Sequence, residues 1–286
     1  MYQLRAPAPA LSPFIEHYWF VTHADGAPVD LRVEVFVDAR ADLIFNFGAP
    51  YRREVIGGEA AEHTRSSLDA QRLVPIRIAQ RGLVRIAGVR FRLGGLGPFS
   101  RGPLAPFTDR TPAPREVLGE EAVALEEDLR REHDVDAQAQ RLDAFFGARL
   151  PVGGPFPQFD RALRALVESS GAASVAEVAA AARVSRGHLD RLFARYLGIP
   201  PKTVGRVLRF QRALRALMTD PAGALADVAA AAGYFDQAHF IKDFKRMSGG
   251  VPRGYRGYYP PAAPTDFAPN VVVFLQDGEP ARRHSG

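Results

Sequence analysis

The strongest constraint on this chain is an internal repeat in its C-terminal half. Residues 174–178 (SVAEV) followed by four alanines match residues 224–228 (ALADV) followed by four alanines. After one extra residue in the second copy, apolar, basic and terminating positions also match: Leu189 with Phe240, Arg191 with Lys242, Phe193 with Phe244, Gly198 with Gly249 and Pro201 with Pro252. Two copies of one pattern indicate a supersecondary unit used twice.

Each copy predicts an alanine-rich helix, a turn and a second, amphipathic helix. Ser174 with Glu177 has the spacing of a capping box, and Ser185 and Asp236 are candidate N-caps of the second helices. The alanine-rich helix is narrow, so the second helix can cross it closely. This order of elements is typical of a helix-turn-helix unit that binds DNA.

One helix is predicted between the copies, over residues 202–218, because Val207, Phe210, Leu214 and Leu217 recur at helical spacing. The Asp220–Pro221 pair predicts its end. A single rigid helix would hold both units at a fixed separation. A separation of about 34 Å would place them in successive major grooves on one side of the duplex.

Residues 158–259 resemble the DNA-binding domain of the AraC/XylS family of bacterial transcription regulators. The resemblance is strongest in the run GYFDQAHFIKDFKRMSGGVPRGYR. The resemblance implies that the second helix of each unit enters the major groove. The base-facing residues that it implies are Gly187, Asp190 and Arg191 in the first copy and Gln237, Ala238 and Lys242 in the second, with Arg186 and His188 as nearby alternatives.

Departures from the family pattern concentrate in the first copy. Gly187 has no side chain to read a base, and Asp190 would repel phosphate or accept from a cytosine amino group. Arg183 stands where the second copy has Gly233, so a positive φ in the first turn would be costly. We therefore expect most direct base readout from Arg191, Gln237 and Lys242, of which arginine suits guanine and glutamine suits adenine.

The positive charge of the chain is confined to the repeat region. Residues 158–259 hold 16 Lys and Arg against 8 Asp and Glu, a balance of +8, whereas residues 1–157 hold 19 against 21 and residues 260–286 hold 2 against 3. This localisation indicates a phosphate-binding surface and hence double-stranded DNA as a partner.

The remaining composition excludes several classes of protein. The absence of cysteine excludes disulfides, cysteine-based zinc fingers and thiol catalysis. The N-terminus lacks the form of a signal peptide, and no apolar run reaches the roughly 18 residues that span a bilayer. We therefore expect a cytoplasmic protein without a membrane partner.

The N-terminal half predicts a β-rich domain. Alternating residues 31–37, 41–48 and 83–95 are typical of strands, and residues 72–78 predict another. The predicted organisation is multidomain: a β-rich (α+β) domain (1–116), a helical segment (117–150), a linker (151–157), the all-α double helix-turn-helix domain (158–259) and a tail (260–286). The resemblance to the AraC/XylS family implies that the first of these is a cupin-like sensory domain. The apolar residues 270–276 of the tail predict an extra strand docked on the N-terminal domain.

The N-terminal runs LSPFIEHYWF, VDARADLIFNFG and AGVRFRLGG also resemble a domain of unassigned function that precedes AraC-type DNA-binding domains. That resemblance implies a small-molecule effector and helices that dimerise. The helical stripe of Leu118, Ala122, Leu125 and Leu129 either forms a homodimer seam or packs on its own β-domain, and the sequence leaves both open.

Candidate effector-binding residues combine aromatic and polar side chains of the N-terminal half: Trp19, Phe36, Asp42, Phe45, Asn46 and Arg90. The alternative is that the aromatic members are ordinary core. The histidines show no His-x-His spacing, and no catalytic serine motif, phosphate loop or dinucleotide fingerprint is present. We therefore predict no catalytic residue, metal or cofactor.

Three functions remain from the sequence. The leading hypothesis is a one-component, effector-controlled transcription regulator. The second is an effector-independent DNA-binding protein whose N-terminal half dimerises or contacts RNA polymerase. The third is an enzyme-like N-terminal domain fused to a DNA-binding domain.

Overall fold

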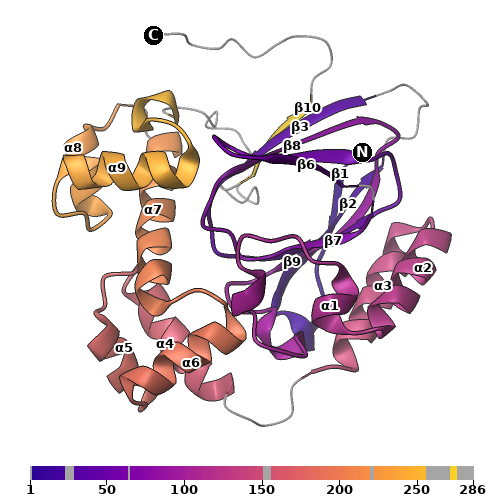
Figure 1. Ribbon diagram of the computed structural model, residues 1–286, viewed down its shortest axis with the longest axis horizontal. Coiled ribbons are helices and arrows are strands. Elements are labelled where there is room, and N and C mark those ends of the chain that lie inside the picture. Colours follow the sequence, from indigo (N-terminus) through magenta and orange to yellow (C-terminus); the bar gives the residue numbers. More distant parts are fainter. Residues whose placement is uncertain are drawn as a thin grey trace.

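The computed structural model describes residues 2–22, 29–63, 65–150, 156–219, 222–255 and 271–275. A β-rich half with three helices lies beside a helical half (Figure 1). Within the described residues, none of the helices has both the length and the apolar content needed to cross a membrane.

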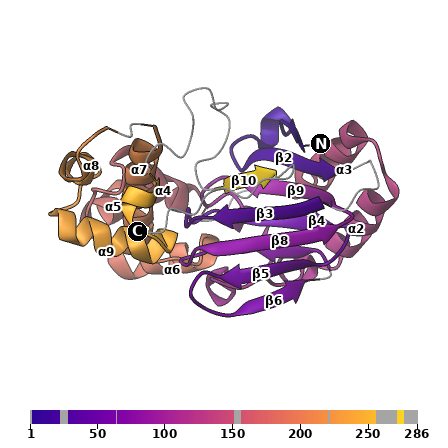
Figure 2. The ribbon, with the colours of Figure 1, turned by 90° about the horizontal axis from the view of Figure 1, so that it is seen from above.

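Two five-stranded antiparallel sheets form the β-rich half (Figure 2). The first has the order β1 (Tyr2–Arg5), β2 (Ile15–Thr22), β9 (Arg85–Phe91), β4 (Asp42–Asn46) and β7 (Ser67–Asp69). The second has the order β10 (Val271–Leu275), β3 (Val29–Val35), β8 (Ile76–Gly82), β5 (Tyr51–Val55) and β6 (Ala60–His63). Residues 270–276, expected to add a strand, thus contain β10, which pairs antiparallel with β3.

One face of the first sheet packs against α1 (Pro114–Leu118), α2 (Glu121–Arg131) and α3 (Val135–Gly147). The strand residues of this core alternate along the chain, for example Leu43 with Phe45 and Val89 with Phe91. The stripe of Leu118, Ala122, Leu125 and Leu129 lies in the same core, and each side chain is at most 5 % exposed. The dimer-seam alternative for this stripe is therefore wrong, because a second chain cannot reach these side chains without opening the core.

The strand predicted over residues 72–78 is wrong in its first part. β7 ends at Asp69 and β8 begins at Ile76. Arg72 is buried between them, with its Nε 2.8 Å from a carboxylate oxygen of Asp69. This buried ion pair, followed by Pro75, which cannot donate to a ladder, accounts for the missing strand residues.

The helical half consists of α4 (Phe156–Glu168), α5 (Val175–Ala182), α6 (Arg186–Tyr196), α7 (Pro201–Thr219), α8 (Leu225–Ala231) and α9 (Gln237–Ser248). α4 includes the last two residues of the linker expected at 151–157, whose first five lie outside the described residues. Short 3-10 helices lie at Pro9–Leu11, Gly97–Phe99, Ala105–Phe107 and Pro252–Tyr255. Between α4–α6 and α8–α9, α7 extends the predicted helix by one residue at each end (Figure 1).

The two halves meet through hydrophobic contacts, because Phe36, Val37 and Ala39 of the β-rich half join the core cluster of the helical half. Polar contacts reinforce this interface. Arg195 of α6 donates through Nη1 to the Gly102 carbonyl (2.7 Å) and through Nη2 to the Ser100 carbonyl (2.9 Å). The N-terminal half therefore touches the first repeat unit through Arg195, and it touches the second through the Val37 amide, which donates to the Met247 carbonyl of α9 (3.4 Å).

Candidate nucleic-acid interface and polar cluster

Local capping fixes both helices of the first unit. The Ser174 hydroxyl accepts from the Glu177 amide (3.2 Å), and the Glu177 carboxylate accepts from the Ser174 amide (2.7 Å). Ser185 caps α6 by accepting from the His188 amide (3.3 Å). In the turn between them Arg183 has a φ of 55°, the left-handed conformation that Gly233 adopts in the second unit. The sequence expectation of a strained first turn is thus met.

The second unit repeats this arrangement. The Asp236 carboxylate accepts from the His239 amide (2.7 Å) and caps α9, as expected from the sequence. Phe240, Phe244 and Met247 bury one face of α9, and the corresponding face of α6 is equally buried. The opposite faces of both helices remain accessible.

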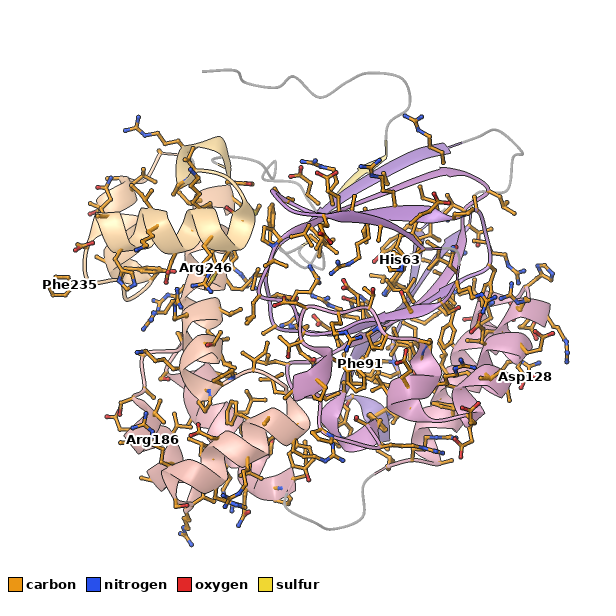
Figure 3. All side chains as sticks on the ribbon, in the orientation of Figure 1. His63, Phe91, Asp128, Arg186, Phe235 and Arg246 are labelled. Carbon is orange, nitrogen blue, oxygen red and sulfur yellow. The ribbon has the colours of Figure 1, made fainter. Side chains whose placement is uncertain are left out.

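The residues implied as base-facing lie on these accessible faces. Exposed are Arg186, Gly187, Asp190, Arg191, Gln237, Ala238 and Lys242. His188 is the exception: it is half-buried, and its Nε2 lies 3.1 Å from Oε1 of Gln158 in α4. Figure 3 shows Arg186, at the start of α6, on the side of the molecule away from the sheets.

The connecting helix α7 is tied to both units. Arg206 pairs with the buried Asp243 of α9, with Nη2 2.5 Å from Oδ1 and Nε 3.2 Å from Oδ2. Arg209 donates to the Gly171 carbonyl (3.4 Å) and lies over the Tyr234 ring, 5.8 Å from its centroid. These contacts hold the two units in one relative orientation.

Close backbone packing adds to this connection. A Cβ on Gly171 would lie 2.2 Å from the carbonyl oxygen of Gly205 in α7. The corner after α4 therefore lies directly on α7, at a distance that only glycine permits.

Several further side chains are exposed near Gln237, Ala238 and Lys242 and were not predicted from the sequence. His239, Lys245 and Arg246 are exposed on α9, and Arg253 follows it. Arg253 and Gln237 line a hollow of about 510 Å³ together with residues 224–226. The spacing of four residues between Lys242 and Arg246 was the available signal for Arg246, because such residues share a helix face.

In the β-rich half, a second set of polar residues lies between the sheets. Trp19, Asp42, Asn46 and Arg90 share the face of the first sheet opposite to the helix-covered one. Two contacts connect this face of the first sheet to β5 of the second sheet. Tyr51 Oη of β5 lies 2.8 Å from Ser67 Oγ of β7, and Arg53 Nη2 of β5 lies 3.3 Å from Asp69 Oδ1 of β7. Four of the six predicted effector residues therefore lie together.

The prediction is wrong for Phe45 and Phe36, which do not lie with the other four residues. Phe45 is buried on the helix-covered face, and Phe36 packs edge-on against Tyr255, with ring centroids 5.3 Å apart. Alternation along β4 explains the first result, because Phe45 lies between Ile44 and Asn46, which both face the other way.

Arg90 lies at the centre of what we call the polar cluster, defined as Asp38, Asp42, Asp69, Arg53, Arg72 and Arg90. Its buried guanidinium pairs with Asp38 and with Asp42. Burial raises the pKa of Asp38, but Arg90, Arg40 and Arg72 outweigh it and lower that pKa. Burial raises the pKa of Asp42, and the facing carboxylates of Asp38 and Asp69 act in the same direction.

Trp19 and His17 border the polar cluster. The Trp19 ring lies against Gly88, its partner on β9: a Cβ added to Gly88 would be 2.0 Å from Trp19 Cε2. His17 lies opposite Arg90, and burial together with nearby arginines lowers its pKa to about 4. Arg53 Nε, Arg90 Nε and Gln80 Oε1 are buried without a hydrogen-bond partner among the described residues. The described part of the chain holds no group of three His, Asp or Glu side chains suited to a metal ion.

Two family models match the chain: a domain of unknown function (DUF6597) over residues 3–113 and a helix-turn-helix domain over residues 178–258. No curated protein matches it. Among solved structures, an AraC-type transcriptional regulator from Chromobacterium violaceum is 25% identical, covers 37% of this chain and 96% of its own, and has a TM-score of 0.35. ToxT from Vibrio cholerae is 10% identical, covers 89% and 97%, and has a TM-score of 0.43.

The matched helix-turn-helix region coincides with the repeated units described above, and the other match covers the β-rich half. The chain therefore carries a helix-turn-helix domain over residues 178–258, which follows a domain of unknown function over residues 3–113.

Proposed function

We propose that one chain reads two successive major grooves through α6 and α9 and that a small-molecule effector in the β-rich half controls this reading. The observation that carries the proposal is the double connection of α7, through Arg206 to α9 and through Arg209 to the first unit. A fixed orientation lets two weak readers act as one binding surface.

Base readout follows from the exposed side chains. Arg191 suits the two acceptors of guanine, and Gln237 suits the donor and acceptor of adenine. Lys242 adds a charged donor, and Asp190 suits a cytosine amino group. Replacing Gln237 with alanine should cost about 1–3 kcal/mol at one base position and relax the choice of base there.

Effector control is supported by a segment that touches both the polar cluster and the DNA-binding domain; we call residues 36–41 the bridge segment. Arg90 pairs with Asp38 inside this segment and with Asp42 just after it. The carbonyl of Val37 accepts from Gln211 of α7, and its amide donates to the Met247 carbonyl of α9 (3.4 Å). A ligand that takes Arg90 away from Asp38 would therefore disturb contacts to α7 and α9.

The test is retention of genomic fragments by the purified protein at about 0.15 M salt, repeated with Lys242→Ala. We expect a recurring site with two blocks about one helical turn apart, weakened in the variant. Arg212→Ala is the matched control, because Arg212 is an exposed cation of α7 outside the reading faces. Retention without sequence preference would contradict the proposal.

For effector control, the same site is titrated in the presence of metabolite pools, alongside thermal melting of the protein. An effector that binds between the sheets should raise the melting temperature and change DNA affinity. If no metabolite pool changes either the melting temperature or the DNA affinity, effector control is contradicted. The proposal that one chain reads two major grooves would not be affected by this result.

A further inference from the structure

Phe235 stands out among the large apolar side chains of the described residues because it is 95 % exposed. The next are Leu83 at 59 % and Val251 at 53 %. Phe235 lies in the turn between α8 and α9, directly before the N-cap Asp236. A phenylalanine in water forgoes the stabilisation that burial of its ring would give.

The fold does not need this ring. The turn is formed by its neighbours: Gly233 provides the positive φ, Tyr234 is buried against Phe240 with centroids 5.3 Å apart, and Asp236 caps α9. The Phe235 ring therefore contributes little to this turn, and its exposed surface lies beside the start of α9.

The position of Phe235 matches the reading face. The N-terminal residues of the second helix of such a unit meet base edges, and Phe235 is separated from Gln237 and Ala238 only by the N-cap Asp236. Figure 3 shows Phe235 pointing away from the sheets, on the same side of the molecule as Arg186 at the start of α6. The two readers thus present their first turns on one side.

We propose that Phe235 reads a thymine by packing its ring against the C5-methyl group in the major groove, at the edge of the second unit's contact. The inference rests on the proposed double reader. A phenyl ring offers no hydrogen bond, and the thymine methyl is the apolar mark that the major groove presents. Phe235 would then add specificity beside the hydrogen-bonding Gln237.

The experiment uses the full chain and the operator recovered from genomic fragments. Each thymidine is replaced in turn by deoxyuridine, which differs only in lacking the methyl group, and affinities are measured for the wild type and for Phe235→Ala. One replacement should weaken the wild type about fourfold, as expected for one buried methyl group. The same replacement should leave Phe235→Ala unaffected.

Two controls separate this effect from folding. Thermal melting of Phe235→Ala should match that of the wild type, because the ring is exposed. Leu83→Ala removes another exposed apolar side chain, in the β-rich half, and should keep the wild-type response to every deoxyuridine.

Each remaining outcome is decisive. A wild type that binds no specific site would refute the double reader itself. A wild type that binds its site while every deoxyuridine is neutral, or with losses that simply add to that of Phe235→Ala, would overturn the thymine contact. Full DNA affinity of Phe235→Ala with lost transcription by purified RNA polymerase would assign the ring to a protein partner and overturn it as well.

Discussion

Replacing Arg206 with alanine tests whether α7 holds the second unit in place. The change leaves the carboxylate of Asp243 buried without its arginine, since the Asp243 side chain is 5 % exposed. Breaking a fully buried ion pair costs about 3–5 kcal/mol. Because 25 % of the Arg206 side chain is exposed, we expect a smaller loss, about 2–3 kcal/mol in the free energy of unfolding.

Urea denaturation of Arg206→Ala and of Arg212→Ala measures this difference, with Arg212 as an exposed arginine of the same helix. The pair Arg206→Met with Asp243→Leu should recover most of the loss, because no unpaired charge then remains.

DNA binding gives a second test of the same variant. The affinity of Arg206→Ala is measured for the two-block site and for a site with a single block, and each is compared with the affinity of the wild type. Arg206→Ala should lose more on two blocks, since the second unit is no longer held at its angle. Equal stability of Arg206→Ala and Arg212→Ala, together with equal DNA affinity, would refute the reasoning.

Three further changes test other parts of the structure. Arg183→Gly should raise the free energy of unfolding by about 0.5–1 kcal/mol, because glycine adopts a φ of 55° without strain but is more flexible when unfolded; unchanged or lower stability in urea would count against this. Gly88→Ala should displace Trp19, the single tryptophan, and shift its fluorescence to the red, whereas Gly147→Ala, which meets no atom within 4 Å, should leave the emission unchanged. Because the pKa of His17 in the folded chain is lowered from 6.5 to about 4, protonation favours the unfolded chain as the pH falls from 6.5 to 4. Over this range the free energy of unfolding of the wild type should decline more steeply than that of His17→Gln. Parallel pH curves for the two proteins would refute this prediction.

The sequence predicted those features that depend on neighbouring residues. The N-caps Ser174, Ser185 and Asp236 and the extent of α7 follow from local spacing, and the structure confirms them. The left-handed turn at Arg183 was foreseeable only because a second copy with Gly233 was available for comparison.

Features that depend on distant residues were not predictable. Arg206 and Asp243 are separated by 37 positions, and nothing in either neighbourhood indicates their pairing. Phe36 alternates like a strand residue facing its own domain, yet it packs against Tyr255 of the helical half. Alternation within β4 alone places Phe45 on the opposite face from Asp42 and Asn46. Arg90 reaches the face of Asp42 and Asn46 only because β9 pairs with β4, which the sequence does not show.

The central claim is that one chain holds two readers at a fixed spacing on one side of the duplex. The most direct measurement is DNA affinity after about 5 base pairs, half a helical turn, are inserted between the two blocks, compared with an insertion of a full turn of about 10. We predict that the half-turn insertion reduces affinity to that of a single block, because α7 cannot turn one reader to the opposite side. Equal affinity for the original and half-turn sites would contradict the account.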